Sequence, residues 1–173
     1  MTSASRASAA STMGSMSRKV TIYLDASFVS ACVTDRTDPK SVSRRDTSRE
    51  WWDTQRTGHE IVISQEVIKE LSNPDFSRRE DALALIADLS LLDIDDEVTG
   101  VAEIFVKEVL MPAPVVGDAV HVAVCAVHGV QYLLSWIVRH LANPNKTAHL
   151  QAICRRLGLI PPQILTPDLL WEF

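Results

Sequence analysis

The stretch "KVTIYLDASFVSACV", residues 19–33, indicates the fold class of this chain. Residues 20–24 are β-branched, aromatic and aliphatic, which is typical of a buried strand, and the run ends on the carboxylate of Asp25. The apolar residues that follow predict the start of a helix or a turn. A carboxylate in this place either caps the next turn or serves a ligand.

The same order of strand and helix recurs along the chain. Apolar strands are predicted at "IVIS" (61–64), "LLDI" (91–94), "YLLSW" (132–136) and, as a closing edge strand, "QILTP" (163–167). Helices are predicted between them, at residues 42–55, 64–71, 77–92, 97–112, 118–128 and 147–159. Strands that are continuous apolar runs and alternate with helices predict an α/β fold with a parallel sheet covered on both faces.

Length and composition predict one soluble domain. The chain has 173 residues, of which 46% are hydrophobic and 23% charged, and no apolar run approaches the roughly 20 residues of a membrane span. The net charge of -5 excludes a global basic field. Cys32, Cys125 and Cys154 lie far apart in apolar surroundings, which predicts reduced, buried thiols in a cytoplasmic protein.

Residues 1–18 are rich in Ser, Ala and Thr and contain no acids. Because they lack an apolar segment, they do not form a secretory signal, although transit peptides share this composition. Met13 and Met16 are alternative starts. We therefore predict a disordered leader over residues 1–18 and a single domain over residues 19–173.

Acidic side chains stand where the predicted strands end or the following helices begin. Asp25 ends the first strand, Glu66 and Glu70 lie one helical turn apart after the second, and Asp118 opens the buried helix before the fourth. Ligands bind at this edge of parallel sheets, and neighbouring carboxylates need a compensating charge. Mg²⁺ is the natural occupant of such a site. Each acid alone also fits a cap, a helix-dipole contact or a solvated helix face.

Four motifs resemble, in order and spacing, the PIN domain, and in particular the VapC-like toxin ribonucleases of bacterial toxin-antitoxin systems. They are "IYLDASFVSA", "ISQEVIKEL", "GDAVHVAVCAVHGVQYLLSW" and "RHLAN". The resemblance covers nearly all of residues 19–173. It implies a three-layer α/β/α sandwich around a central parallel sheet and an endoribonuclease that depends on Mg²⁺ or Mn²⁺.

The resemblance also assigns the site. Asp25, Glu70 and Asp118 match the catalytic, metal-holding acids, and Glu66 is the less favoured second acid. Ser27 and Ser135 match supporting hydroxyls, and His140 and Asn143 match a subgroup with Trp, His and Asn in this region. His140 fits a phosphate contact or a loop tether. His121, on the apolar helix, fits a hydrogen-bonded core histidine better than a ligand.

One position departs from the family pattern. Ile137 stands where the family has a fourth acid or, in this subgroup, Asn. An aliphatic side chain cannot coordinate metal, so the alternative function is a catalytically degenerate PIN-fold binding module. A phosphoryl-aspartate enzyme built on Asp25 is a weaker alternative, because Ser27 stands where that chemistry requires a second aspartate.

The resemblance further implies RNA as substrate, a small antitoxin protein as partner, and a homodimer without membrane attachment. RNA would need local cations, and the candidates are Arg44, Arg45, Arg49, Arg78, Arg79 and Arg139. Acids are interspersed among them, which predicts that most are solvated and ion-paired.

Overall fold

The computed structural model describes residues 19–137 and 144–171, so the predictions for residues 1–18, Arg139, His140 and Asn143 fall outside the described residues. Five strands form one sheet in the order β3-β2-β1-β4-β5, and every neighbouring pair is parallel. The strands are β1 (Thr21–Leu24), β2 (Glu60–Ser64), β3 (Ser90–Leu92), β4 (Tyr132–Leu134) and β5 (Gln163–Leu165). The predicted α/β fold is therefore confirmed.

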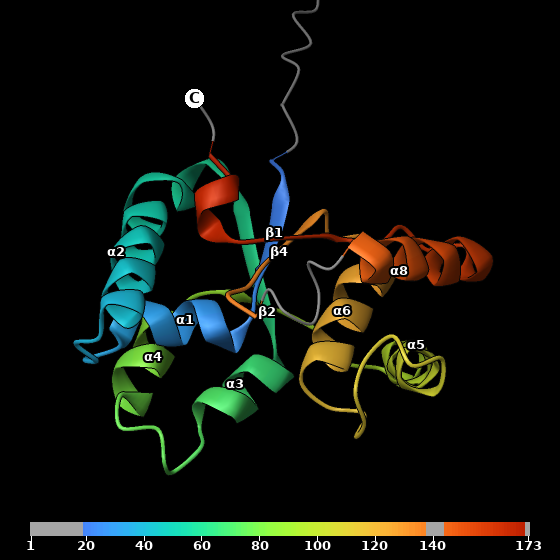
Figure 1. Ribbon diagram of the computed structural model, residues 1–173, viewed down its shortest axis with the longest axis horizontal. Coiled ribbons are helices and arrows are strands. Elements are labelled where there is room, and N and C mark those ends of the chain that lie inside the picture. The colour runs from blue at the N-terminus through green and yellow to red at the C-terminus, as the bar shows by residue number, and fades with distance from the viewer. Residues whose placement is uncertain (1–18, 138–143, 172–173) are drawn as a thin grey trace, which may run out of the picture.

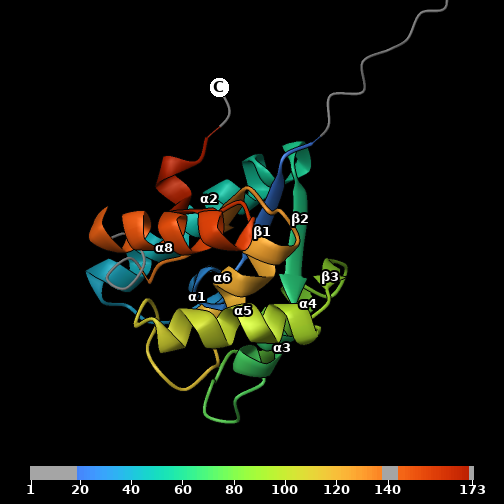
Figure 2. The same ribbon diagram turned by 90° about the vertical axis from the view of Figure 1, so that its right-hand side faces the viewer.

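Helices cover both faces of the sheet (Figure 1). One face carries α1 (Ala26–Val33), α2 (Pro39–Thr54), α3 (Gln65–Leu71) and α4 (Arg79–Leu85). The other carries α5 (Asp96–Lys107), α6 (Asp118–Val127) and α8 (Pro144–Leu157), with α5 packed across α6 (Figure 2). This is the predicted three-layer α/β/α sandwich.

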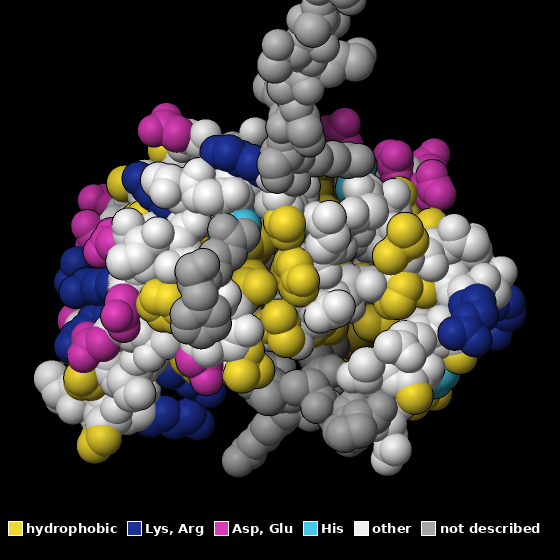
Figure 3. All heavy atoms as spheres, turned by 90° about the horizontal axis from the view of Figure 1, so that it is seen from above, with side chains coloured by type: hydrophobic (Ala, Val, Ile, Leu, Met, Phe, Trp, Pro, Cys, Tyr) yellow, Lys and Arg dark blue, Asp and Glu magenta, His cyan; other side chains and the backbone are white. Residues whose placement is uncertain are grey.

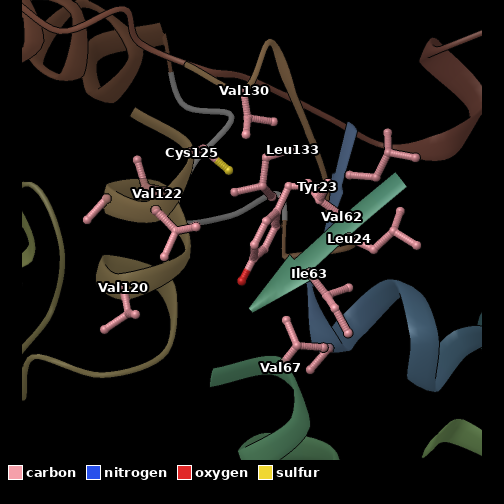
Figure 4. Packing of buried hydrophobic residues seen from close by; sticks show 14 of the residues in the cluster. Tyr23, Leu24, Val62, Ile63, Val67, Val120, Val122, Cys125, Val130 and Leu133 are labelled. Carbon is pink, nitrogen blue, oxygen red and sulfur yellow. The ribbon is translucent and has the colours of Figure 1, made fainter. Parts of the chain in front are cut away.

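The core lies between these layers and explains the apolar sequence of β1 and α6. Ile22, Tyr23 and Leu24 of β1 are fully buried, because β1 is the central strand and has neighbours on both edges and both faces. Val122 and Cys125 of α6 face the sheet beside Leu133 (Figure 4). The three cysteines are free and buried as predicted, and burial raises the pKa of Cys32 to about 12 and of Cys154 to about 11.

Two helices end earlier than their sequence patterns predict. Helix α4 stops at Leu85, so Leu89 lies outside it, and the chain then turns to pair Ser90 with Val62 of β2. Helix α5 stops at Lys107 because Val109 has a φ of 58°, a left-handed conformation that ends the helix. The next residues fold back to bury Leu110 and Met111.

The loops contain two short 3₁₀ turns, Arg56–Gly58 and Pro167–Leu169. Figure 3 looks onto the end of the molecule where the strands begin, and hydrophobic side chains gather near its centre with charged side chains toward the rim. Across residues 19–137 and 144–171, we find no helix with the length and apolar character needed to span a membrane.

Candidate functional site

The strand order reverses at β1, whose neighbours β2 and β4 precede helices on opposite faces of the sheet. In open α/β sheets this reversal opens a crevice at the carboxyl ends of the strands. Leu24 pairs with Leu134 at the end of both strands, and the Asp25 amide donates to the Leu134 carbonyl at 3.3 Å. Asp25 and Ser135 therefore leave the sheet side by side at the reversal point.

Asp25 is a buried carboxylate, 2% exposed, at the N-cap of α1. Its Oδ1 atom accepts hydrogen bonds from the Phe28 amide at 3.0 Å and from the Ser27 hydroxyl at 2.6 Å. Burial raises the pKa of Asp25, and the charge of His121 and the hydrogen bonds only partly oppose that effect. The side chain of Asp25 thus caps α1, and its burial makes its negative charge costly.

Two serine hydroxyls connect the ends of β1 and β4. The Ser27 Oγ atom lies 3.3 Å from the Ser135 Oγ atom and accepts a hydrogen bond from the Trp136 amide at 2.8 Å. Ser135 Oγ in turn accepts from the Ile137 amide at 2.9 Å. These bonds fix the chain that leaves β4 against Asp25, and they hold Ile137 at the border of the crevice.

A buried chain of hydrogen bonds links Glu70 to the sheet. Glu70 Oε2 lies 3.3 Å from His121 Nε2, and His121 Nδ1 lies 2.7 Å from the Tyr23 hydroxyl. The Tyr23 hydroxyl also lies 2.6 Å from Ser64 Oγ at the end of β2, and Figure 4 shows it pointing from the sheet toward the region of α6. His121 is therefore the hydrogen-bonded core histidine that the sequence predicts, but one of its partners is an acid of the candidate site.

The charges of all three predicted acids act on the His121 imidazole. Burial alone lowers the pKa of His121, but the hydrogen bond and charge of Glu70, followed by the charges of Asp25 and Asp118, outweigh it. The net result is a raised pKa. An imidazolium at this position would offset part of the negative charge that the acids concentrate at this edge of the sheet.

Glu66 has a structural role at the start of α6. It is 8% exposed, and its Oε1 atom accepts a hydrogen bond from the Gly117 amide at 2.9 Å. Lys69 pairs with its other oxygen at 3.3 Å. Helix α3 thereby positions the helix that begins with Asp118, and Glu70 is left one turn away to face His121.

We expect Gly117→Ala to lower the free energy of unfolding by about 1–3 kcal/mol. Gly117 has a φ of 57°, and a Cβ there would lie 3.0 Å from Glu70 Oε1. The measurement is urea unfolding followed by circular dichroism. Gly100→Ala is the control, because Gly100 lies within α5 and a Cβ there meets nothing within 4 Å. That control should gain about 0.5–1 kcal/mol, and an equal gain at Gly117 would contradict the prediction.

The donor chemistry of the site suits a hard divalent cation, since carboxylate oxygens are its preferred protein ligands. The raised pKa of buried Asp25 also shows a carboxylate whose charge lacks full compensation. Among residues 19–137 and 144–171, however, no three Asp, Glu, His or Cys side chains come together in a group that could hold a metal ion. The acids share one electrostatic environment, and Glu70 is engaged with His121.

The site includes residues that the sequence analysis did not select. The sequence predicts Tyr23 as a strand residue and Ser64 at the junction of a strand and a helix, because a buried hydroxyl pair 41 positions apart leaves no local pattern. One signal in the sequence connects this network to the predicted acids. His121 follows Asp118 by three residues and so lies on the same side of the helix. Glu66 is the less favoured second acid in the sequence. In the structure its carboxylate accepts a hydrogen bond from the Gly117 amide, 51 positions away.

Solved structures share this fold. The toxin VapC20 of Mycobacterium tuberculosis, described as cleaving the sarcin-ricin loop, aligns with a TM-score of 0.53 and 21% identity over 70% of this chain and 93% of that chain. VapBC2 of Rickettsia felis, solved bound to a DNA fragment from its promoter, aligns with a TM-score of 0.50 and 10% identity over 88% of this chain and 100% of that chain.

No protein-family model matches the sequence. No curated protein matches it either. At these identities the structural likeness establishes the fold alone, and the chain shares the fold of these two solved structures, as the sequence resemblance implies.

Proposed function

We propose that this chain, with its VapC-like fold, is a divalent-metal-dependent endoribonuclease and the toxin of a bacterial toxin-antitoxin system. The observation that carries the proposal is the position of Asp25, a buried carboxylate where the strand order reverses. Its charge raises the pKa of His121, as do the charges of Glu70 and Asp118. Structural likeness to VapC20, a toxin that cleaves the sarcin-ricin loop, supports the choice of RNA as substrate.

Asp25, Glu70 and Asp118 would hold Mg²⁺ or Mn²⁺ in this proposal. A bound divalent cation supplies a Lewis acid that lowers the pKa of water and neutralises charge on a phosphodiester. Ser27 keeps the Asp25 carboxylate oriented through its 2.6 Å hydrogen bond. Ser135 anchors the chain after β4 by accepting from the Ile137 amide. His121 would orient Glu70 through the hydrogen bond between them, and Tyr23 holds His121 through its hydroxyl. The predicted roles of His140 and Asn143 stay predictions.

The remaining parts of the proposal concern partners and location. A small antitoxin protein would neutralise the enzyme by covering the crevice, and the likeness to the VapBC2 structure supports a partner of that class. A homodimer and a cytoplasmic location stay predictions that follow from the resemblance.

The direct test is cleavage of a mixed RNA pool by purified, partner-free protein in Mg²⁺ or Mn²⁺ against EDTA. We expect cutting in either metal and none in EDTA. Calorimetric titration of the same sample with Mn²⁺ measures metal binding independently. A folded sample that neither binds Mn²⁺ nor cuts RNA would rule the nuclease out.

A second candidate function is a PIN-fold binding module that has lost turnover, and Ile137 is the observation in its favour. Ile137 is 37% exposed at the border of the crevice and brings no ligand atom. We expect Ile137→Asn to change the cleavage rate less than tenfold, because three acids suffice for the proposed site. A supporting ligand is worth roughly 10–100-fold, so a gain of that size would favour the degenerate module. Ile137→Leu controls for side-chain volume.

A further inference from the structure

A cavity of about 400 Å³ opens beside Ser27, the residue whose hydroxyl donates to Asp25. Helices α1 and α2, the loop before α4 and the chain after β4 enclose it. Its volume falls within the range of small-ligand sites. Its lining includes four apolar or aromatic residues, Ala31, Phe76, Trp136 and Ile137, and three cationic residues, Arg36, Arg44 and Arg78. Such a combination fits a ligand with both a ring system and an anionic group.

Arg44 is held in place by Trp136. Its guanidinium lies over the indole ring, 5.1 Å from the ring centroid, and its Nη2 atom donates to the Trp136 carbonyl at 3.2 Å. The indole is itself fixed, because Trp136 Nε1 donates to the buried Ser48 hydroxyl at 2.8 Å. A guanidinium carries five N–H donors, so a planar cation orientated in this way keeps donors for a phosphate group.

The other charged groups of the cavity leave it favourable to an anion. Arg36 and Arg78 add positive charge, and Asp35 and Asp75 subtract from it. Arg78 is also paired with Asp81 at 2.7 Å, but both side chains are more than a third exposed. An exposed pair of this kind contributes little free energy, so Arg78 can exchange its partner for a phosphate at small cost.

Ser27 connects this cavity to Asp25, since it lines the cavity and donates to the Asp25 carboxylate. We infer that the cavity binds the nucleotide next to the scissile phosphate of a single-stranded RNA, with the base against Phe76, Trp136 and Ile137 and the phosphate on Arg44 and Arg78. This inference rests on the proposed function. It also gives Ile137 a role, as an apolar contact for a base.

Single-stranded RNA is the substrate class that this chemistry fits. Unstacked bases bind aromatic and apolar side chains, and arginine planes hold the adjoining phosphates. The chain as a whole carries a net charge of -5, so attraction to RNA has to come from local arginines such as these. Arg44 and Arg78 are among the arginines that the sequence suggests for RNA contact. They line the cavity, whereas their sequence neighbours Arg45 and Arg79 do not.

The test is the affinity of the full chain for a fluorescein-labelled, mixed-sequence RNA 12-mer, measured by anisotropy in EDTA so that no cleavage occurs. We expect Arg44→Ala and Arg78→Ala each to weaken binding about tenfold, as for loss of a charge-assisted hydrogen bond. The slope of log affinity against log salt should fall by about 0.7 for each phosphate contact removed. Arg44→Lys, which keeps the charge, should retain that slope.

Arg45→Ala and Arg79→Ala are the matched controls, because each removes one arginine next to a cavity residue in sequence. They should bind within twofold of the wild type. Equal effects at Arg44 and Arg45 would overturn the inference and would indicate RNA binding by general surface charge. Unchanged RNA affinity in both cavity variants would also overturn it and would leave the cavity to a protein partner. Cleavage in Mg²⁺ is measured separately. Arginine-dependent binding without cleavage would keep the cavity as an RNA-binding site and rule out the nuclease, and cleavage with unaffected binding would keep the nuclease and rule out the cavity as its RNA-binding site.

Discussion

Replacing Asp25 with asparagine is expected to reduce RNA cleavage by roughly 10²–10³-fold while leaving the protein folded. The loss is expected because the amide cannot supply the negative charge that holds a divalent cation. The fold should survive because an asparagine Oδ1 can still accept the hydrogen bonds that Phe28 and Ser27 donate to Asp25. Asp118→Asn should lose activity in the same way.

The Asp25 substitution also has an expected effect on stability, whose sign follows from the raised pKa. A group whose pKa is higher in the folded state stabilises the fold below its unfolded pKa, and this contribution is lost as the pH rises through the folded pKa. For Asp25 the pKa of the carboxyl in the fold is raised above 3.8, the ordinary value of an aspartate, so the folded carboxyl binds its proton more tightly. Relative to wild type, Asp25→Asn should therefore gain stability as the pH is raised from about 4 toward neutrality.

The matched controls are Asp38→Asn and Asp95→Asn. Both aspartates are N-caps, of α2 and α5, and each accepts a hydrogen bond from a backbone amide as Asp25 does. Asn is an equally good N-cap, so neither control should change cleavage or stability by much. If Asp25→Asn cleaved RNA as fast as these controls, the Asp25 carboxylate would serve only as a helix cap. The proposal that it holds a catalytic metal ion would then be wrong.

Replacing Trp51 with alanine is expected to lower the free energy of unfolding by about 3–5 kcal/mol. Trp51 is fully buried, packs edge-on against Phe28 with ring centroids 5.6 Å apart, and stacks on His59 at 6.0 Å. Its indole nitrogen donates to the Leu170 carbonyl at 2.7 Å. One side chain thus ties α1, α2 and the chain after β5 together.

Thermal unfolding measures this effect, and a domain of this length should lose roughly 6–20 °C in Tm. Trp51→Phe keeps an aromatic ring and removes the hydrogen bond to Leu170, so it should lose less than half as much. A Tm within 2 °C of wild type for Trp51→Ala would mean that the core between α1 and α2 does not depend on this ring.

The fold could be predicted from the sequence because its elements are local patterns. Each strand is a short apolar run with its own boundaries, and the apolar helix after Gly117 has to be buried. Asp25 could be selected as a site residue for the same reason, since its place at the end of a strand is visible in sequence. Helix α4 was predicted too long because apolar residues up to Leu89 keep the helical spacing, whereas pairing of Ser90 with β2 ends the helix earlier.

The contacts between distant segments could not be predicted in this way. The hydrogen bond from the Gly117 amide to Glu66 joins residues 51 positions apart, and the cavity beside Asp25 combines α1, α2, a loop and the chain after β4. Which arginine faces that cavity depends on the packing of α2 against α1. Arg44 and Arg45 are adjacent and chemically identical, so only three-dimensional structure separates them.

The central position of β1 has a consequence for the synthesis of the protein. The ribosome makes β1 first among the strands, yet β4, which flanks it and supplies Ser135 beside Asp25, is made more than a hundred residues later. Contacts between segments so distant in sequence form late and slowly. The surroundings of Asp25 therefore stay incomplete on the nascent chain, and under the proposed function RNA cleavage would begin only after most of the chain has left the ribosome that made it.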